Sequence, residues 1–196
     1  MRFHNVIIIA GSIVIALLIV GGVVIIRAIA LNTPEPTVQM KSSHPRLWIV
    51  SGGQTGVDRA ALDTALSLFM PVRGWCPKGR LAEDGRIPPI YPLQETTSTD
   101  YAVRTEWNVR DSDGTLILSS EPLEGGTKLT VDLAQEYKRP VLVINSLSFN
   151  DNDITRFWNW IRDRNIRILN VAGPRESAQP GVIYKRAQEV LKQLFE

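Results

Sequence analysis

Two patterns of apolar residues divide the chain. Residues 6–26 form an uninterrupted apolar run without a charged side chain. At about 1.5 Å per residue a helix of this length is about 31 Å long, which matches the hydrocarbon core of a bilayer. Residues 46–196 instead alternate short β-rich runs with segments whose apolar residues recur at helical spacing. The pattern predicts one transmembrane helix followed by one α/β domain.

The residues that flank the apolar run leave an alternative open. Ala28-Ile29-Ala30 has the small-x-small form of a signal-peptide cleavage site, although the apolar part of a signal peptide is usually only about 7–15 residues long. We favour the anchor. Arg27, Lys41 and Arg46 outnumber Arg2 on the other side, which favours a cytoplasmic domain. Residues 1–5 are then a short tail, and the proline-containing segment 27–45 is a flexible linker.

Five strands and five helices are expected in the domain. The predicted strands are Leu47–Val50, Val72–Trp75, Thr115–Ser119, Pro140–Ile144 and Ile166–Val171. The predicted helices are Val57–Phe69, Asp100–Arg110, Thr127–Tyr137, a segment around Phe157–Ile161, and Val182–Phe195. This alternation predicts a doubly wound, mainly parallel, Rossmann-like sheet. In the order 2-1-3-4-5, strands one and three would be neighbours at the point where the winding reverses, and a ligand would bind there.

A glycine-rich loop follows the first predicted strand. Glycine allows a positive φ and a close approach of the backbone to a ligand, and the free amides at a helix start attract anions. The loop lacks the lysine and spacing of a Walker motif and is not GxGxxG. In the alternative interpretation, the glycines only form a tight turn and Asp58 caps the helix. The candidate binding residues are Ser51, Gly52, Gly53, Gln54, Thr55, Gly56 and Asp58.

A similar loop follows the third predicted strand, where Leu123-Glu124 precedes Gly125, Gly126 and Thr127. Two such loops beyond neighbouring strands would face one crevice and could bind one phosphate-bearing ligand. The Thr127 hydroxyl either caps its helix or donates to a phosphate.

The segment 76–92 is a long loop with candidate cations. Lys78 and Arg80 could neutralise a phosphate or an oxyanion, or they could pair with the neighbouring Glu83 and Asp84. Cys76 could be a metal or redox ligand, although a small buried apolar side chain is the more common role of a single thiol.

Composition excludes several classes of function. A formal net charge of +2 and the absence of a basic cluster argue against nucleic-acid binding. The only cysteine rules out an intramolecular disulfide. The two histidines, His4 and His44, precede the domain, so neither a histidine-based triad nor a zinc site is expected. No catalytic or metal-binding residue is predicted. Asp111 or Asp113, near the third strand, could reach the crevice.

Several long motifs resemble those of the putative molybdenum carrier family. They are GGQTGVDRAALD (residues 52–63), GWCPKGRLAEDG (74–85), RTEWNVRDSDGTLI (104–117) and GGT (125–127). The resemblance implies a homo-oligomer that holds the molybdenum cofactor, a pterin with a dithiolene-bound metal and a phosphate, without covalent contacts. Matched by position, the two glycine loops and the loop with Lys78 and Arg80 would line its crevice. Such carriers are typically soluble, so the predicted membrane helix departs from the family.

These observations predict a membrane-anchored carrier of molybdenum cofactor or a related phosphorylated small molecule. A more distant resemblance, to lysine decarboxylase-like phosphoribohydrolases and DNA-processing proteins, leaves an enzyme as the alternative. The phosphoribohydrolases have a PGGxGTxxE signature whose glutamate acts on the glycosidic bond. The corresponding segment reads EGGTKLTVD, in which only Asp132 lies nearby. A membrane-tethered ligand sensor is the third possibility.

Overall fold

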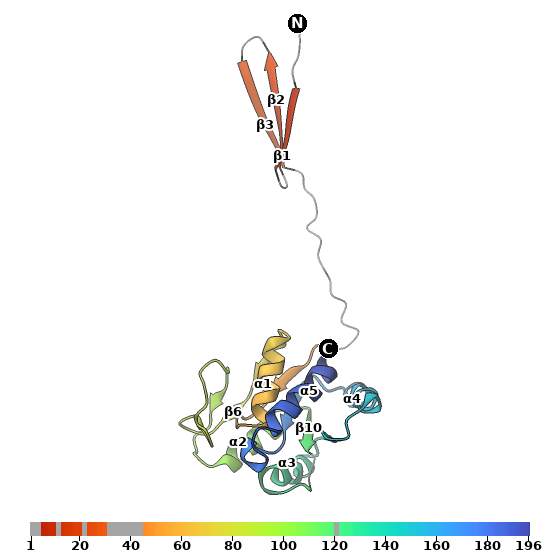
Figure 1. Cartoon of the computed structure of the whole chain (residues 1–196). Coiled ribbons are helices and arrows are strands. Elements are labelled where there is room, and N and C mark those ends of the chain that lie inside the picture. The colour runs from red at the N-terminus through yellow and green to blue at the C-terminus, as the bar shows by residue number, and fades with distance from the viewer. Residues whose placement is uncertain (1–4, 11–12, 21–22, 31–44, 120–121) are drawn as a thin grey trace. The chain divides into compact units, whose positions relative to one another are not determined.

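The chain consists of two compact units, Met1–Ser43 and His44–Glu196. The structure is a computed structural model, and it describes residues 5–10, 13–20, 23–30, 45–119 and 122–196. Most of the predicted linker, with His44, and the histidine at position 4 lie outside these ranges. The two units are described separately below (Figure 1).

The first unit is a three-stranded antiparallel sheet, where the sequence had predicted one helix over residues 6–26. Its strands are β1 (Asn5–Ala10), β2 (Ile13–Val20) and β3 (Val23–Ala30), and β2 pairs with both others. The run is rich in valine and isoleucine, which favour strands as well as membrane helices. No helix among the described parts of the chain is long and apolar enough to cross a membrane. The transmembrane helix is therefore not supported.

The second unit has a five-stranded parallel sheet, as predicted. Its strands are β4 (Trp48–Val50), β5 (Val72–Arg73), β10 (Gly114–Ser119), β11 (Val141–Asn145) and β12 (Ile168–Ala172). All pairs are parallel. β10 is buried along its whole length, which is typical of a central strand with helices on both faces.

The order of the strands differs from the prediction. The observed order is β11-β10-β12-β4-β5, so β12, the last strand of the chain, lies between β4 and β10. The first and third strands of the domain are therefore not neighbours. The strands can be renumbered so that β10, β11 and β12 are the first, second and third, and β4 and β5 are the fourth and fifth. The order then becomes 2-1-3-4-5. The winding is the expected one, but its starting point in the chain is different.

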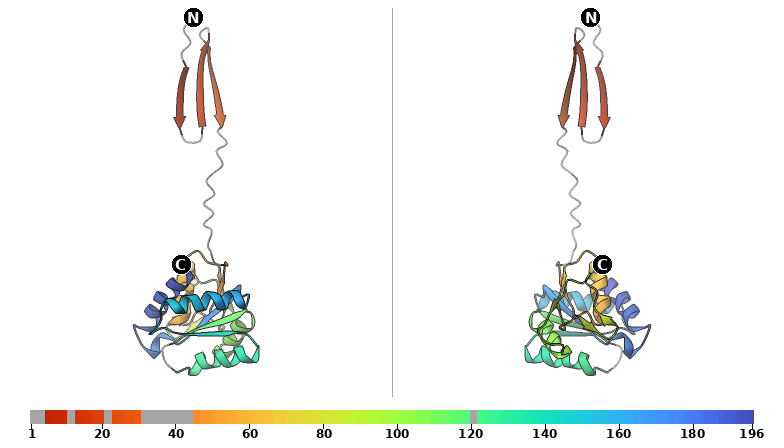
Figure 2. Two further views of the ribbon diagram at one scale, coloured as in Figure 1. Left: turned by 90° about the vertical axis from the view of Figure 1, so that its right-hand side faces the viewer. Right: turned by 90° about the vertical axis from the view of Figure 1, so that its left-hand side faces the viewer.

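Five helices cover the sheet, three on one face and two on the other (Figure 2). The first face carries α1 (Val57–Ser67), α4 (Asp151–Asp163) and α5 (Ile183–Phe195). The other face carries α2 (Tyr101–Arg110) and α3 (Gly125–Glu136). A short 3-10 helix, η1 (Glu176–Ala178), precedes α5. Phe157 and Ile161 of α4 are buried in the main core.

The predicted end of the first helix was wrong. α1 ends at Ser67, and Phe69, which the spacing placed on its apolar face, is 91% exposed with φ 53°. The backbone turns out of the helix before Phe69, so the helical spacing no longer determines its direction.

The loop 76–92 is folded rather than open. It contains β7 (Leu81–Ala82) and β8 (Gly85–Arg86), which form a small hairpin, and β6 (Trp75–Cys76) pairs with β9 (Gln94–Glu95) beyond it. Apolar side chains of this region form a second small core. Cys76 is fully buried in it, and burial raises the pKa of its thiol, which fits the interpretation of Cys76 as a small apolar side chain.

Candidate functional site

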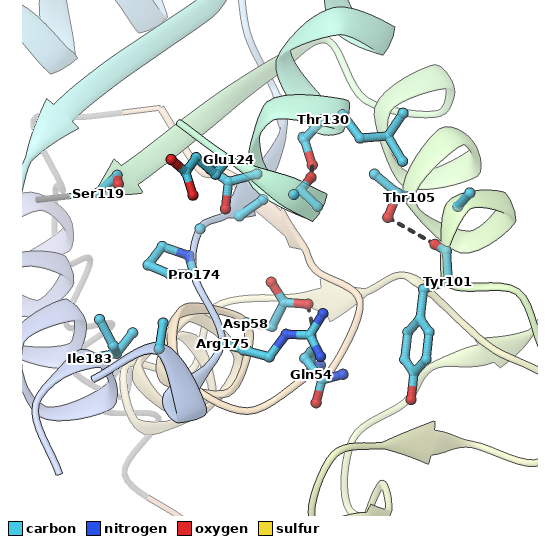
Figure 3. Close-up of a pocket in the computed structure, with 18 of the residues that line it drawn as sticks. Gln54, Asp58, Tyr101, Thr105, Ser119, Glu124, Thr130, Pro174, Arg175 and Ile183 are labelled. Atoms are coloured by element: carbon cyan, nitrogen blue, oxygen red, sulfur yellow. Dashed lines mark hydrogen bonds between the residues drawn. The ribbon is translucent and has the colours of Figure 1, made fainter. Parts of the chain in front are cut away.

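A cavity of about 440 Å³ lies beyond the carboxyl ends of β10 and β12 (Figure 3). Ser119 ends β10 and Ala172 ends β12, and both line the cavity. These two strands are the pair at which the winding reverses, where open α/β sheets bind their ligands. The volume falls within the range of small-molecule sites, about 300–1,000 Å³.

The start of α3 forms one wall of the cavity with accessible backbone amides. A side chain added at Gly125 or Gly126 would meet nothing within 4 Å, so the backbone faces open space there. The Glu124 carbonyl accepts from the amides of Thr127 and Lys128. Across the described ranges, the amides of Gly125 and Gly126 donate to no protein group. They are therefore free to bind an anion at the positive end of the helix.

Several amides of the loop before α1 are already hydrogen-bonded within the protein. The amide of Gln54 donates to Asp58 (3.2 Å), that of Thr55 donates to the Gln54 side chain (3.0 Å), and that of Val57 donates to the Pro174 carbonyl (3.3 Å). Its glycines make room for other parts of the protein. An added Cβ at Gly52 would collide with Arg104, one at Gly53 with Leu93, and one at Gly56 with backbone atoms of residues 174–176.

Of the candidates in this first loop, only Gln54 and Asp58 line the cavity, whereas Ser51, Gly52, Gly53, Thr55 and Gly56 do not. All three candidates in the second loop, Gly125, Gly126 and Thr127, line it. Residues of both loops thus line one cavity, and each loop contributes to it in a different way.

A buried ion pair joins the first loop to α2. Arg104 Nη1 donates to Asp58 Oδ2 over 3.0 Å, and the two side chains are only 14% and 5% exposed. Burial raises the pKa of Asp58, and the Arg104 guanidinium offsets part of the rise. Both residues line the cavity. Arg104 was not predicted as a site residue, because nothing in its local pattern indicated that α2 packs against the Asp58 loop.

The segment after β12 forms the third wall, and the sequence analysis missed it. Gly173, Pro174, Arg175 and Gln179 line the cavity between the two glycine loops. The Arg175 side chain is 57% exposed, and its nearest carboxylate, Glu83, is 3.9 Å away. The insertion of β12 between β4 and β10 places this segment in the middle of the site, which a prediction based on the other strand order could not show.

Glu83 ties this third wall to the rest of the site. Its carboxylate accepts from the Ser177 amide (3.0 Å) and hydroxyl (2.5 Å) and from the Thr55 hydroxyl. Burial by itself would raise the pKa of Glu83. The hydrogen bonds from Ser177 and Thr55, together with the positive charge of Arg175, lower this pKa below its usual value. Glu83 thus stabilises the arrangement of three loops that are far apart in sequence.

The two predicted cations lie elsewhere. Arg80 donates to the carbonyls of Ile87, Leu93, Pro88 and Tyr91 over 2.9–3.0 Å, so it holds the long loop together from inside. The Lys78 side chain is exposed. Neither residue lines the cavity.

The other carboxylates considered also lie outside the cavity. Asp113 precedes β10, at the opposite end of that strand, and accepts from the amides of Arg167 and Ile168. Asp111 accepts from Trp75 and Arg110. Asp132 pairs with Lys128 on the exposed side of α3. Thr130, on the same helix, does line the cavity. Within the described ranges, no group of three or more His, Cys, Asp or Glu side chains could hold a metal ion.

The comparisons with known proteins agree with this geometry. The family model described as "Circularly permutated YpsA SLOG family" matches residues 49–195. The chain belongs to this family. The strand order of the sheet is itself that of a permuted 2-1-3-4-5 winding. The permutation explains why a prediction that numbered the strands from the start of the domain misplaced β12.

A solved structure supports the same relationship. It is the crystal structure of a putative molybdenum carrier protein from Syntrophus aciditrophicus SB, with 46% sequence identity and a TM-score of 0.74. The match covers 78% of this chain and 97% of that chain. No curated protein matches the sequence. The resemblance to the putative molybdenum carrier family is therefore confirmed, and the matched part of the solved protein is nearly its whole length.

Proposed function

We propose that this protein of the permuted YpsA family binds a phosphate-bearing small molecule, such as molybdenum cofactor, in the cavity between β10 and β12. The observation that carries the proposal is the open start of α3, where Gly125 and Gly126 line the cavity and their amides have no acceptor among the described residues. The name of the solved relative, a molybdenum carrier, is consistent with such a cargo.

The charged side chains that line the cavity leave one positive charge without a close partner, which suits an anionic ligand. Two guanidinium groups, Arg104 and Arg175, and two carboxylates, Asp58 and Glu124, line it. Arg104 and Asp58 neutralise each other, whereas Arg175 has only a distant partner. We infer that the phosphate lies against the start of α3 and that Arg175, from the third wall, contributes a charge-assisted hydrogen bond.

The change Gly126→Pro tests the α3 amides directly. Proline removes one amide donor but suits the first turn of a helix, where that amide has no intrahelical acceptor. A hydrogen bond to a charged group contributes about 1.5–3 kcal/mol. We therefore expect the affinity for a phosphorylated pterin, measured by titration calorimetry on the full-length chain, to fall about 10- to 100-fold.

Gly126→Ala is the matched control, because it keeps the amide and an added Cβ would meet nothing within 4 Å. Its affinity is expected to stay within about threefold of the original chain, and the thermal midpoints of both variants establish that each is folded. Equal affinities for the proline and alanine variants would contradict the proposed phosphate position.

We further propose that the chain is attached to a membrane through the apolar segment 6–26, with its α/β domain in the cytoplasm, and that it is a homo-oligomer. The length of uncharged sequence supports the attachment. Fractionation of cells is expected to recover the full-length chain with membranes and a chain that starts at Lys41 in the soluble fraction. Recovery of both in the soluble fraction would contradict the attachment, and light scattering of the second chain measures its oligomeric state.

A further inference from the structure

We propose that the α/β domain lies with the amino-end edge of its sheet against an anionic phospholipid membrane, so that the cavity opens away from that membrane. The inference rests on the membrane attachment proposed above and adds to it a surface of the domain itself. Because all strand pairs are parallel, the amino ends of the strands share one edge and the carboxyl ends share the opposite edge. The cavity lies at the carboxyl ends of β10 and β12.

Backbone hydrogen bonds join the segments of the amino-end edge into one continuous surface. The Trp48 amide, at the start of β4, donates to the Arg167 carbonyl before β12 over 2.8 Å. The Ile49 amide donates to the Pro71 carbonyl before β5 over 2.9 Å, and the Asp113 amide, before β10, donates to the first carbonyl of β12 over 2.8 Å. Segments that are far apart in sequence are therefore neighbours at this edge.

Phe69 has neither a packing nor a backbone reason to stand at its position. It follows α1, just before Pro71, with a side chain that is 91% exposed and a backbone φ of 53°. At such a position after a helix, glycine or asparagine is preferred, because other side chains are strained there. Asn165 takes the corresponding position after α4, with φ 50°. The strain and the exposure of Phe69 together point to a role outside the fold.

Trp48 adds a second aromatic side chain to the edge. It begins β4, the strand next to β5, and is 44% exposed. The guanidinium carbon of Arg73 lies 5.5 Å from the centroid of its ring. Tryptophan is enriched where a membrane meets water, because its ring is largely apolar and its N–H group reaches the headgroups. Arginine binds phosphate groups well, so this pair suits the headgroup region of a bilayer.

The charged side chains near these aromatic rings are mainly positive. The exposed cations at the amino ends of the strands are Arg46, Arg73, Lys138, Arg139, Arg164 and Arg167. The exposed carboxylates there are fewer, and they are Asp111 and Asp163, which pair with Arg110 and Arg162, together with Glu136 and Glu196. Asp113 accepts from two backbone amides. A cluster of cations next to a membrane is attracted to anionic lipids.

The rest of the chain joins the domain at this same edge. β4 is the first strand of the domain, and the apolar segment 6–26 precedes it in the chain. Attachment of that segment to a membrane would hold the domain near the lipid surface at a high effective concentration. Weak attractions at the amino-end edge are then enough to orient the domain.

Quenching of tryptophan fluorescence by brominated lipid measures the contact, because bromine quenches only rings that it touches. The full-length chain is reconstituted in vesicles of brominated phosphatidylcholine, with or without phosphatidylserine. We expect Trp48 to be quenched at least about twofold more strongly in vesicles with phosphatidylserine, and high salt to remove the difference. The difference between the original chain and Trp48→Phe isolates the signal of Trp48.

Phe69→Asn tests the aromatic contact without harm to the fold, since asparagine suits this backbone conformation. Its thermal midpoint should stay the same or rise, while the quenching of Trp48 falls about twofold or more. Leu147→Asn is the matched control, because Leu147 is 54% exposed and follows the carboxyl end of β11. It should leave the quenching unchanged.

Arg46→Glu tests the charge in the same way and should lower the quenching of Trp48 about twofold or more in vesicles with phosphatidylserine. Arg186→Glu is its control. Arg186 is exposed and lies in the first turn of α5, where Ile183 lines the cavity, so its reversal should change nothing.

Sedimentation with the same vesicles separates the two proposals. If the chain sediments only with vesicles that contain phosphatidylserine, attachment through the apolar segment is wrong while the docking surface stands. If it sediments with both kinds and Trp48 is quenched equally in both, or if Phe69→Asn behaves like Leu147→Asn, the docking surface is overturned while the attachment stands. Binding of an oligonucleotide at this edge, with Trp48 unquenched by lipid, would also overturn it.

Discussion

Replacing Arg104 by methionine is expected to lower the free energy of unfolding by about 3–5 kcal/mol, because it leaves the charge of Asp58 buried without its partner. The pair joins the first glycine loop to α2, and 3.0 Å separate Arg104 Nη1 from Asp58 Oδ2. Methionine keeps much of the apolar volume, so the loss of charge dominates the effect. Chemical denaturation of the full-length chain measures the change.

The pH dependence of this variant has a defined sign. Burial already raises the pKa of Asp58, and without Arg104 the pKa rises further. A raised pKa in the folded state means that stability is complete below the unfolded value, near 3.8, and decreases as the pH rises through the folded value. The destabilisation by Arg104→Met should therefore be larger at pH 7 than at pH 4.5.

Arg162→Met is the control for an exposed pair. Arg162 and its partner Asp163 are 71% and 64% exposed, and surface pairs of this kind contribute about 0–1 kcal/mol. If Arg104→Met were no more harmful than Arg162→Met, or if its effect did not depend on pH, the buried pair would not have the energetic role described here.

Replacing Gly56 by alanine is expected to destabilise the domain by about 3 kcal/mol or more, through backbone strain and overpacking together. Gly56 has φ 73° and ψ −127°. An added Cβ would lie 2.6 Å from the Pro174 carbonyl oxygen and 2.8 Å from the Glu176 amide nitrogen. Both are backbone atoms, so no side-chain movement relieves the contact.

Gly181→Ala separates strain from packing. Gly181 has a similar φ of 79°, but a Cβ there would meet nothing within 4 Å, so only the strain of about 1–2 kcal/mol is expected. The amount by which Gly56→Ala lowers the free energy of unfolding more than Gly181→Ala then measures the contact with the third wall. Because that contact positions Arg175, Gly56→Ala should also weaken phosphorylated probes. Equal destabilisation by the two changes would contradict this packing.

The sequence predicted the sheet well because each strand is a local feature. β10 and β11 are apolar β-branched runs between polar turns, and both formed where the pattern placed them. Their order could not be predicted in the same way. Each strand–helix unit has the same local signature whether or not the chain is permuted, so nothing in the residues of β12 showed that it lies next to β4.

The site was predicted in part for the same reason. Gly125 and Gly126, which line the cavity, could be chosen from the sequence because a glycine-rich start of a helix is visible in a few adjacent residues. Arg104 and Arg175 were missed because their roles depend on contacts with segments far away in sequence, such as the Asp58 loop. Arg80 lies outside the cavity, and a half-buried arginine that donates to backbone carbonyls looks like a ligand-binding cation in the sequence.

The composition of the apolar N-terminal segment does not determine its secondary structure. Valine and isoleucine satisfy the hydropathy of a membrane helix and also the preference of a strand. Hydropathy alone therefore did not distinguish a helix over residues 6–26 from the three strands β1, β2 and β3.

If the cavity beyond β10 and β12 binds a phosphorylated ligand through the start of α3, a crystal structure of the chain with neopterin phosphate will show it. We expect phosphate oxygens within hydrogen-bond distance of the Gly125 and Gly126 amides. A phosphate bound at Lys78 or at the loop before α1, or an empty cavity at saturating ligand, would contradict it.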